Sequence, residues 1–142
     1  MKLSLARICA VIALVTIPLT AQAREAVPIV DYPDNTIFTS SGQALTTDQV
    51  KNAIVTAATG RSWQVAKGAK GEELQAMLQV RGKHTVVVTI TYSAQAYSIL
   101  YQNSTNMKYS YVPDTNTRVI HPYNNRWVSE LREGIRMELN KL

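Results

Sequence analysis

Two consecutive stretches of alternating side chains constrain the fold of this chain more than any other feature. In the first stretch, 73–81, Leu74, Ala76, Leu78 and Val80 fall on one side, and all residues on the other side except Met77 are polar. The second stretch, 84–92, repeats the pattern with Val86, Val88, Ile90 and Tyr92. A period of two is typical of a β-strand with one buried face. Because Gly82 and Lys83 separate the stretches, the sequence predicts an antiparallel hairpin with one apolar face.

A second strong signal marks the start of a helix. Thr46 and Gln49 have the spacing of a capping box, in which the hydroxyl caps the first turn and the glutamine side chain returns to the backbone of the cap. An apolar stripe follows at spacings of three and four, through Val50, Ala53, Ile54 and Ala57. The sequence therefore predicts a helix from Thr47 to about Thr59, ended by Gly60.

Shorter strands are predicted on both sides of the hairpin. Trp63 and Val65 alternate with polar neighbours before the glycine-containing turn 67–71. Residues 96–102 form another alternating run, and the pattern leaves its inward face open. A short strand is indicated at 109–112, within a polar segment that is otherwise rich in turn formers.

The two ends of the domain are predicted to differ. The segment 24–34 contains two prolines and few apolar residues, which favours an extended arm, and a short edge strand is expected at 35–40 through Ile37 and Phe38. After residue 125 a last helix is predicted, whose apolar side consists of Trp127 or Val128, Leu131, Ile135 and Leu139.

These elements predict an α+β fold. We expect an antiparallel three- to four-stranded meander with an N-terminal and a C-terminal helix packed on one face. The opposite face of the sheet would point toward water or a partner. We find no internal repeat, so residues 24–142 are expected to form a single domain.

The first residues have the pattern of an export signal. Lys2 and Arg7 precede an apolar run, 8–19, that is too short to span a bilayer, and Ala21 and Ala23 meet the small-residue requirement of a signal peptidase. We expect cleavage after Ala23 and a periplasmic location, with an uncleaved N-terminal anchor as the alternative.

Removal of the signal would also remove the single cysteine, Cys9. This cysteine lacks the apolar stretch that a lipobox needs upstream, so we expect no stable membrane anchor after cleavage. Of the 142 residues, 119 would remain, and the loss of Lys2 and Arg7 would lower the net charge from +5 to +3. The remaining basic residues are scattered, which does not favour binding to nucleic acid.

Two segments carry a resemblance to a known family. They are 97–109, with the sequence Tyr-Ser-Ile-Leu-Tyr-Gln-Asn-Ser-Thr-Asn-Met-Lys-Tyr, and 120–128, with the sequence Ile-His-Pro-Tyr-Asn-Asn-Arg-Trp-Val. Together with 45–54 and 61–63, they make the chain resemble small exported bacterial proteins that are labelled as lipoproteins or as uncharacterised periplasmic proteins. The resemblance implies a compact domain of the cell envelope and supplies no catalytic residues. The chain departs from the lipoprotein members because it lacks a usable lipobox.

Catalytic chemistry has weak support in the sequence. His121 is the one candidate base, with Asp114 as a residue that would orient it, but no serine lies in a nucleophile motif and a histidine beside a proline at a helix start is typical of a cap. His84 and His121 lack the spacing of a zinc site, and no calcium loop is complete. We therefore expect no metal and no cofactor.

Polar aromatic residues gather in the second half of the chain. Tyrosine rings among amides and a guanidinium suit a groove for a glycan, a peptide or a lipid headgroup, whereas the plainer interpretation is that the rings complete the core. The candidate binding residues are Tyr97, Tyr101, Asn103, Tyr109, His121, Asn124 and Arg126. We expect a non-enzymatic binding or assembly module of the envelope. The alternatives are a structural or stress-related envelope protein without a discrete ligand and, last, a small hydrolase that uses His121.

Overall fold

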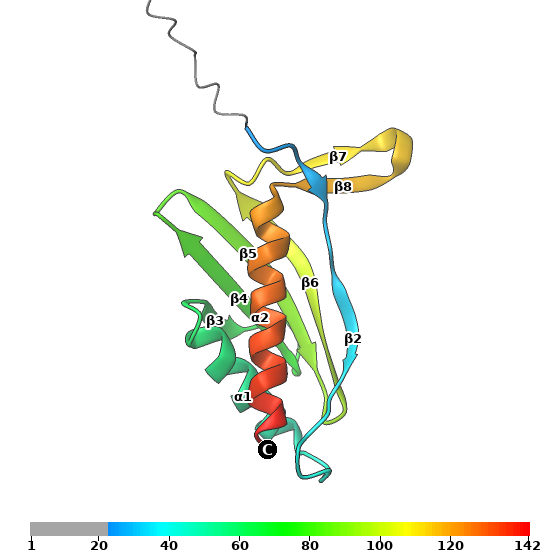
Figure 1. Ribbon diagram of the computed structural model, residues 1–142, viewed down its shortest axis with the longest axis vertical. Helices are drawn as coiled ribbons and strands as arrows, with labels where there is room; N and C mark the ends of the chain where they lie inside the picture. Colours follow the sequence, from blue (N-terminus) through cyan, green and yellow to red (C-terminus); the bar gives the residue numbers. More distant parts are fainter. Residues whose placement is uncertain (1–22) are drawn as a thin grey trace, which may run out of the picture.

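A computed structural model describes residues 23–142 (Figure 1). Except for Ala23, the predicted export signal lies outside these residues, as does Cys9. The elements in chain order are β1 (Val27–Pro28), β2 (Tyr32–Thr36), α1 (Thr47–Thr59), β3 (Gln64–Lys67), β4 (Glu73–Val80), β5 (His84–Tyr92), β6 (Ala96–Thr105), β7 (Ser110–Val112), a 3-10 turn (Pro113–Thr115), β8 (Thr117–Ile120) and α2 (Pro122–Asn140). Neither helix of this described part is long and apolar enough to cross a membrane.

The predicted hairpin is the centre of an antiparallel sheet with the strand order β2-β6-β5-β4-β3. β4 pairs with β5 from Glu73 opposite Thr91 to Val80 opposite His84. The predicted inward residues of the two strands are buried, except for the half-buried Val80. The hairpin and its apolar face are therefore confirmed. β6 continues the sheet and extends to Thr105, three residues beyond the predicted strand.

α1 begins as the capping-box spacing predicts. The Thr46 hydroxyl accepts a hydrogen bond from the Gln49 amide at 3.2 Å, and Gln49 Oε1 accepts one from the Thr46 amide at 2.9 Å. The other end differs in detail from the prediction. Gly60 has right-handed dihedral angles, and the left-handed residue that turns the chain is Ser62, with φ of 65°. The next residue, Trp63, enters the core with 3% of its surface exposed.

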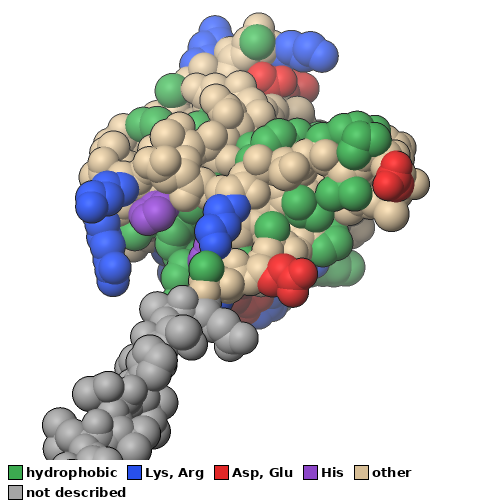
Figure 2. Space-filling view, turned by 90° about the horizontal axis from the view of Figure 1, so that it is seen from above, with side chains coloured by type: hydrophobic (Ala, Val, Ile, Leu, Met, Phe, Trp, Pro, Cys, Tyr) green, Lys and Arg blue, Asp and Glu red, His purple; other side chains and the backbone are tan. Residues whose placement is uncertain are grey.

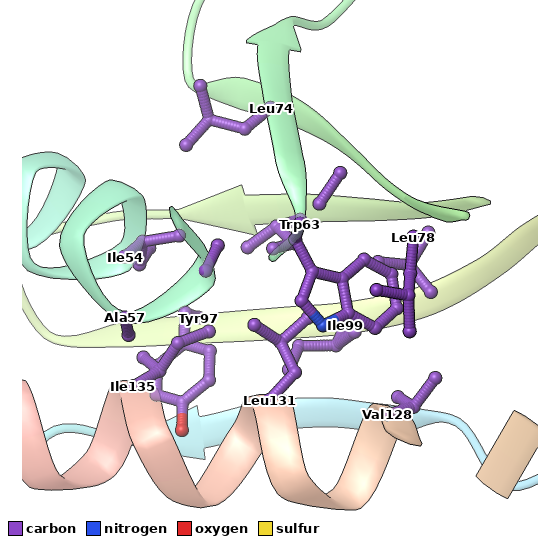
Figure 3. Close-up of a cluster of buried hydrophobic side chains, with 14 of the residues drawn as sticks. Ile54, Ala57, Trp63, Leu74, Leu78, Tyr97, Ile99, Val128, Leu131 and Ile135 are labelled. Atoms are coloured by element: carbon purple, nitrogen blue, oxygen red, sulfur yellow. The ribbon is translucent and has the colours of Figure 1, made fainter. Parts of the chain in front are cut away.

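The two helices lie side by side over the apolar face of the five-stranded sheet (Figures 1 and 3). Their contact residues fill the space between the layers: Ile54 and Ala57 from α1, Val128, Leu131 and Ile135 from α2, and Leu74, Leu78 and Ile99 from the sheet. α2 begins four residues earlier than the pattern predicted, because Pro122 fits the first position of a helix, where no amide donor is needed.

The strand count differs from the prediction. The main sheet has five strands rather than three to four, and β1, β8 and β7 form a separate three-stranded sheet in that order. β8 was not predicted because the segment 103–117 and the residues after it show no apolar alternation. Such short strands are stabilised by their backbone pairing, here Val27 opposite Ile120 and Ser110 opposite Val119.

The predicted edge strand at 35–40 is wrong in position. The strand is β2, at Tyr32–Thr36, and Phe38 is 75% exposed. β2 contains Pro33, which a sheet edge tolerates because one side of an edge strand needs no amide donor. The pairing of β2 with β6 shifts between Tyr32 and Asn35, where Asp34 has a φ of 48°.

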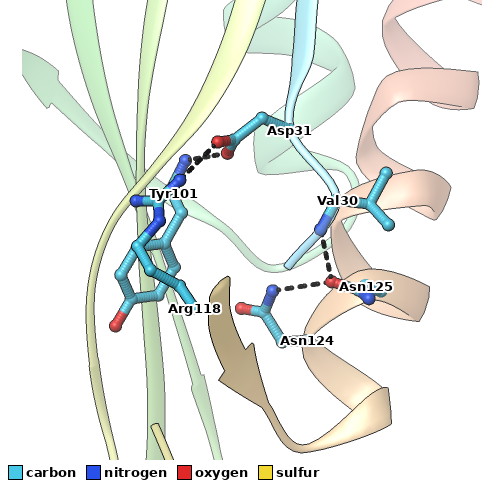
Figure 4. A network of polar contacts seen from close by, with 6 residues as sticks. All are labelled: Val30, Asp31, Tyr101, Arg118, Asn124 and Asn125. Carbon is cyan, nitrogen blue, oxygen red and sulfur yellow. Dashed lines mark hydrogen bonds and ion pairs between the residues drawn. The ribbon is translucent and has the colours of Figure 1, made fainter. Parts of the chain in front are cut away.

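Polar contacts fix the N-terminal arm to the rest of the domain (Figure 4). The Asp31 carboxylate accepts from the Tyr101 amide at 2.7 Å and from Arg118 Nη2 at 2.8 Å. The Asn125 side chain accepts from the Val30 amide at 3.1 Å and donates to the carbonyl of β1 at Pro28, at 2.8 Å. The expected arm is therefore a tethered segment that joins both sheets to the start of α2.

Candidate functional site

A cleft lies at the end of the main sheet, where the β4–β5 turn approaches the start of α2. Its volume is about 420 Å³, which is sufficient for a small ligand. It is lined by Val80, Arg81, His84, Met107, His121, Tyr123, Arg126, Trp127 and Glu130. We call it the histidine cleft, because both histidines of the chain line it. Figure 2 looks onto this end of the molecule, where histidine lies beside lysine and arginine side chains.

His121 caps the N-terminus of α2. Its Nδ1 accepts a hydrogen bond from the Tyr123 amide at 3.2 Å, and its own amide donates to the Met107 carbonyl at 2.7 Å. Because Nδ1 is the acceptor, the neutral imidazole carries its proton on Nε2. Burial lowers the pKa of His121, and the positive charges of Lys108 and Arg24 lower it further. Both effects favour the neutral ring that the cap requires.

His84 is held by the loop that follows β6. Its Nδ1 lies 2.9 Å from the Asn106 carbonyl oxygen, so Nδ1 carries a proton and Nε2 of the neutral ring is the acceptor. Asn106 has a φ of 55°, and its side chain donates to the Lys83 carbonyl at 2.8 Å. The loop therefore fixes the β4–β5 turn. At Nε2 the neutral His84 ring presents an acceptor, whereas the neutral His121 ring presents a donor.

Charged side chains surround the histidines. Arg81 lines the cleft from the β4–β5 turn, where its φ is 53°, a conformation that non-glycine residues seldom adopt. Arg126 lines it from α2, and its Nε lies 2.9 Å from Glu130 Oε1. The hydrogen bond to Glu130 raises the pKa of Arg126. Glu130 thus offsets part of the positive charge of the cleft.

The N-terminal arm brings a further cation to the same place. The Arg24 guanidinium lies 4.9 Å from the centre of the Tyr123 ring, and Lys108 Nζ donates to the Arg24 carbonyl at 3.3 Å. Tyr123 in turn lies 4.9 Å from the His121 ring and 5.7 Å from the Trp127 ring, measured between centroids. The cleft therefore has an aromatic wall on α2 and positive charge around it.

The tyrosines considered as a binding groove do not form one surface. Tyr101 and Tyr109 stack with centroids 5.3 Å apart and planes 5° apart, and Arg118 lies over Tyr101 at 5.8 Å. Tyr101 also shares a hydrogen bond of 2.9 Å with Ser104, and burial raises its pKa. The stacked pair lies where β6 meets the three-stranded sheet, and neither tyrosine lines the histidine cleft.

The remaining candidates are spread over the domain. Tyr97 is 4% exposed, lies in the core and donates to the Arg132 carbonyl at 3.4 Å. Asn124 is 1% exposed and donates to Asn125 Oδ1 at 3.2 Å, while its own Oδ1 has no partner in the described chain. Asn103 is exposed and accepts from the Ser104 amide at 2.8 Å. The structure therefore brings together His121 and Arg126, and separately Tyr101 and Tyr109.

The proximity of His84 and Arg81 to His121 was not predicted. The two histidines were considered together only as zinc ligands, and their separation along the chain gives no spacing signal. The available clue was positional, since one histidine directly follows the hairpin turn and the other directly precedes a helix. Only the packing of α2 along the hairpin brings these two positions together.

Asp114, the residue that would orient a catalytic His121, lies elsewhere. Asp114 is in the 3-10 turn between β7 and β8, and no hydrogen bond joins it to His121 within 23–142. The same described part of the chain has no cluster of three or more His, Cys, Asp or Glu side chains suited to a metal ion. Fold and site thus define a two-sheet α+β domain with a basic, histidine-lined cleft. No family model, curated protein or solved structure matches the chain.

Proposed function

We propose that this protein is a non-enzymatic binding module of the cell envelope and that it holds its ligand in the histidine cleft. The location rests on the export pattern of residues 1–23 and on the resemblance to exported bacterial proteins. The binding role rests on the cleft. As candidate ligands we retain a glycan, a lipid headgroup and a segment of an envelope protein.

One observation carries the proposal: four separate parts of the chain contribute donors or aromatic rings to one hollow. Arg81 comes from a turn, His84 from β5, His121 from the residue before α2, and Trp127 from α2 itself. Ligand sites typically combine an aromatic wall with a few polar groups in this way. The stacked Tyr101–Tyr109 pair does not line this hollow.

A hydrolytic function is less well supported. A catalytic base needs an available acceptor atom within reach of its substrate. The acceptor of His121, Nδ1, already receives the Tyr123 amide. The other alternative, a structural protein without a discrete ligand, would leave the cleft without a role, and it is the outcome that the following experiment separates from ours.

The test is site-specific photocrosslinking of the exported protein in cells. A photoreactive residue at Lys83, an exposed position next to the cleft in the β4–β5 turn, should capture a partner in a saturable way and leaves Arg81 in place. The matched control is the exposed Gln95, which lies in the β5–β6 turn at the opposite end of the same hairpin. Equal capture at both positions, or none at either, would contradict the proposal, and retention of the chain inside the cell would contradict the location.

A further inference from the structure

Resting on the proposed function, we propose that the histidine cleft binds a phosphate-type oxyanion of an envelope ligand. A ligand of this class carries negative charge, unlike a neutral glycan or a cationic peptide.

The charge around the cleft is mainly positive. Arg81 and Arg126 line it, and Glu130 is the one acid among the lining residues that the structure describes. Arg24 and Lys108 add two cations beside Tyr123 and His121. Cations that converge on a partly enclosed hollow raise the local concentration of anions and bind oxyanions through charge-assisted hydrogen bonds.

The donors of the cleft also suit an oxyanion. A guanidinium presents several N–H groups in one plane and matches phosphate oxygens, and both Arg81 and Arg126 line the hollow. The neutral His121 ring carries its proton on Nε2, because Nδ1 is occupied as the helix cap. Nδ1 of His84 donates to the Asn106 carbonyl, so Nε2 is the ring nitrogen of His84 that is left to contact a ligand.

The hollow continues beyond the anion-binding groups. A neighbouring depression of about 370 Å³ shares Val80, Arg81, Trp127 and Glu130 with the histidine cleft and reaches Trp63 and Leu78. The part of the ligand next to the anion would therefore lie along the Trp127 ring. This continuity suits a phosphorylated headgroup or a phosphorylated soluble compound, both of which carry the same oxyanion.

The first measurement uses sulfate, whose charge does not change between pH 5 and 8. NMR spectra of the two histidine rings should show saturable shifts with sulfate that chloride at equal ionic strength does not reproduce. The His121 pKa should rise when sulfate is bound, because the anion offsets the positive charges near the ring. These charges belong to Arg24, Lys108, Arg81 and Arg126, and the other titratable groups of the cleft are His84, Tyr123 and Glu130. Shifts that chloride reproduces would mean screening alone and would overturn the proposal.

Substitutions give opposite predicted signs. Arg81→Gln should weaken sulfate and phosphate binding about tenfold, because a charge-assisted hydrogen bond is lost. Glu130→Gln should strengthen binding, because it removes the one lining acid and releases Arg126. The control is Lys70→Gln, an exposed cation in the β3–β4 loop that does not line the cleft. Equal weakening by Arg81→Gln and Lys70→Gln would show a general charge effect and contradict a site.

The last experiment separates the two sources of the oxyanion. Vesicles of phosphatidylcholine with and without phosphatidylglycerol are compared with soluble glycerol phosphate and with a neutral disaccharide. Binding to anionic vesicles alone identifies a lipid headgroup, and equal binding to glycerol phosphate identifies a soluble ligand; either supports the inference. If only the disaccharide binds, or if the photoreactive residue at Lys83 still captures a partner while no anion binds, the inference fails and the proposed binding function survives.

Discussion

The main sheet and the three-stranded sheet are stabilised in different ways. Between the main sheet and its helices, the largest buried side chains are apolar, among them Ile54, Ile90 and Leu131. Around the three-stranded sheet, by contrast, the contacts are polar. Arg118 donates a hydrogen bond to the Asp31 carboxylate, and the Asn125 side-chain amide donates one to the carbonyl of Pro28 in the arm. The first region depends on excluded water and the second on individual hydrogen bonds.

The difference matters for the candidate site, which lies between the two regions. Arg81 and His84 belong to the hairpin of the apolar region, whereas Lys108 and Arg24 belong to segments that polar contacts hold. Apolar burial is non-directional and tolerates small adjustments, but a hydrogen bond loses its contribution when one partner is removed. We therefore expect a disruptive substitution in the apolar region to destabilise the whole domain, and one in the polar region to destabilise mainly its own surroundings.

The largest expected effect comes from a charge in the apolar core. Leu78→Asp would place an unpaired carboxylate at a position that is 8% exposed, at a cost comparable to the whole stability of a small domain, about 5–15 kcal/mol. The variant should show no cooperative thermal transition by circular dichroism. Thr89→Asp, on the opposite face of the sheet, should remain folded and lose about 1 kcal/mol. Similar melting temperatures for the two would contradict the assignment of the two faces.

A smaller and more local loss is expected at the polar end. Asp31→Asn weakens the contact with Arg118 and should cost about 1–2 kcal/mol, since the ion pair is partly exposed. Hydrogen exchange should accelerate in β1, β7 and β8 while β4 and β5 keep their protection. Asp34→Asn is the control, because the hydrogen bond of Asp34 to Ser98 uses its backbone amide. Equal acceleration in β4 and β5 would show that the two regions unfold as one unit.

The stability contributed by the His121 cap, at the boundary between the two regions, should depend on pH. The folded state holds the pKa of His121 below its ordinary value of 6.5, so the unfolded chain binds the proton more readily. The cap contributes its full stability above pH 6.5. This stability is lost as the pH falls below 6.5 and through the lower pKa of the folded state. We expect a loss of at most about 1 kcal/mol, the usual size of an N-cap.

The measurement is urea unfolding at pH 7.5 and at pH 5. His121→Asn supplies a capping oxygen that does not titrate, so the part of the pH dependence that belongs to the cap should disappear in this variant. An unchanged pH dependence in His121→Asn would assign the effect to other groups.

The smallest effect concerns the contact between the helices. Gly134 is buried in α2, and an alanine Cβ at this position would overlap the guanidinium of Arg61, which lies against it. Gly134→Ala gains about 1 kcal/mol in helix propensity, but it must displace the end of a flexible side chain, so the net change should be within about 0.5 kcal/mol.

The double variant separates these terms. In an Arg61→Ala background, Gly134→Ala should gain the full propensity of about 1 kcal/mol, measured by urea unfolding. Equal effects of Gly134→Ala in the two backgrounds would show that Arg61 does not occupy this space.

The elements with strong local patterns were predicted well. The capping box of Thr46 and Gln49 formed as expected, and so did the hairpin of β4 and β5, because each signal depends on residues that are close in the sequence. β2 was misplaced, since it pairs with the distant β6, and β8 was missed, since its side chains show no apolar alternation. The cap at His121 was anticipated as the plainer role of this residue, and the structure confirms it.

The candidate binding residues do not form one group in the structure. Tyr97 and Asn124 were grouped with exposed aromatic and amide residues because their chemistry is similar, but both are buried. Composition identifies a residue type that suits binding, whereas burial depends on which face of a strand or helix the residue occupies. For β6 the pattern left that face open.

By itself, the sequence determined the α+β class, the main hairpin, the first helix and the apolar side of the last helix, because periodicity and capping act over a few neighbouring residues. Only the tertiary structure decided that His84 and His121 share a cleft, that Arg24 reaches Tyr123, and that the tyrosines separate into core and surface. Contacts between distant segments arise when helices and strands pack to bury apolar surface, and the polar residues that meet at the borders of that packing leave no periodic pattern along the chain.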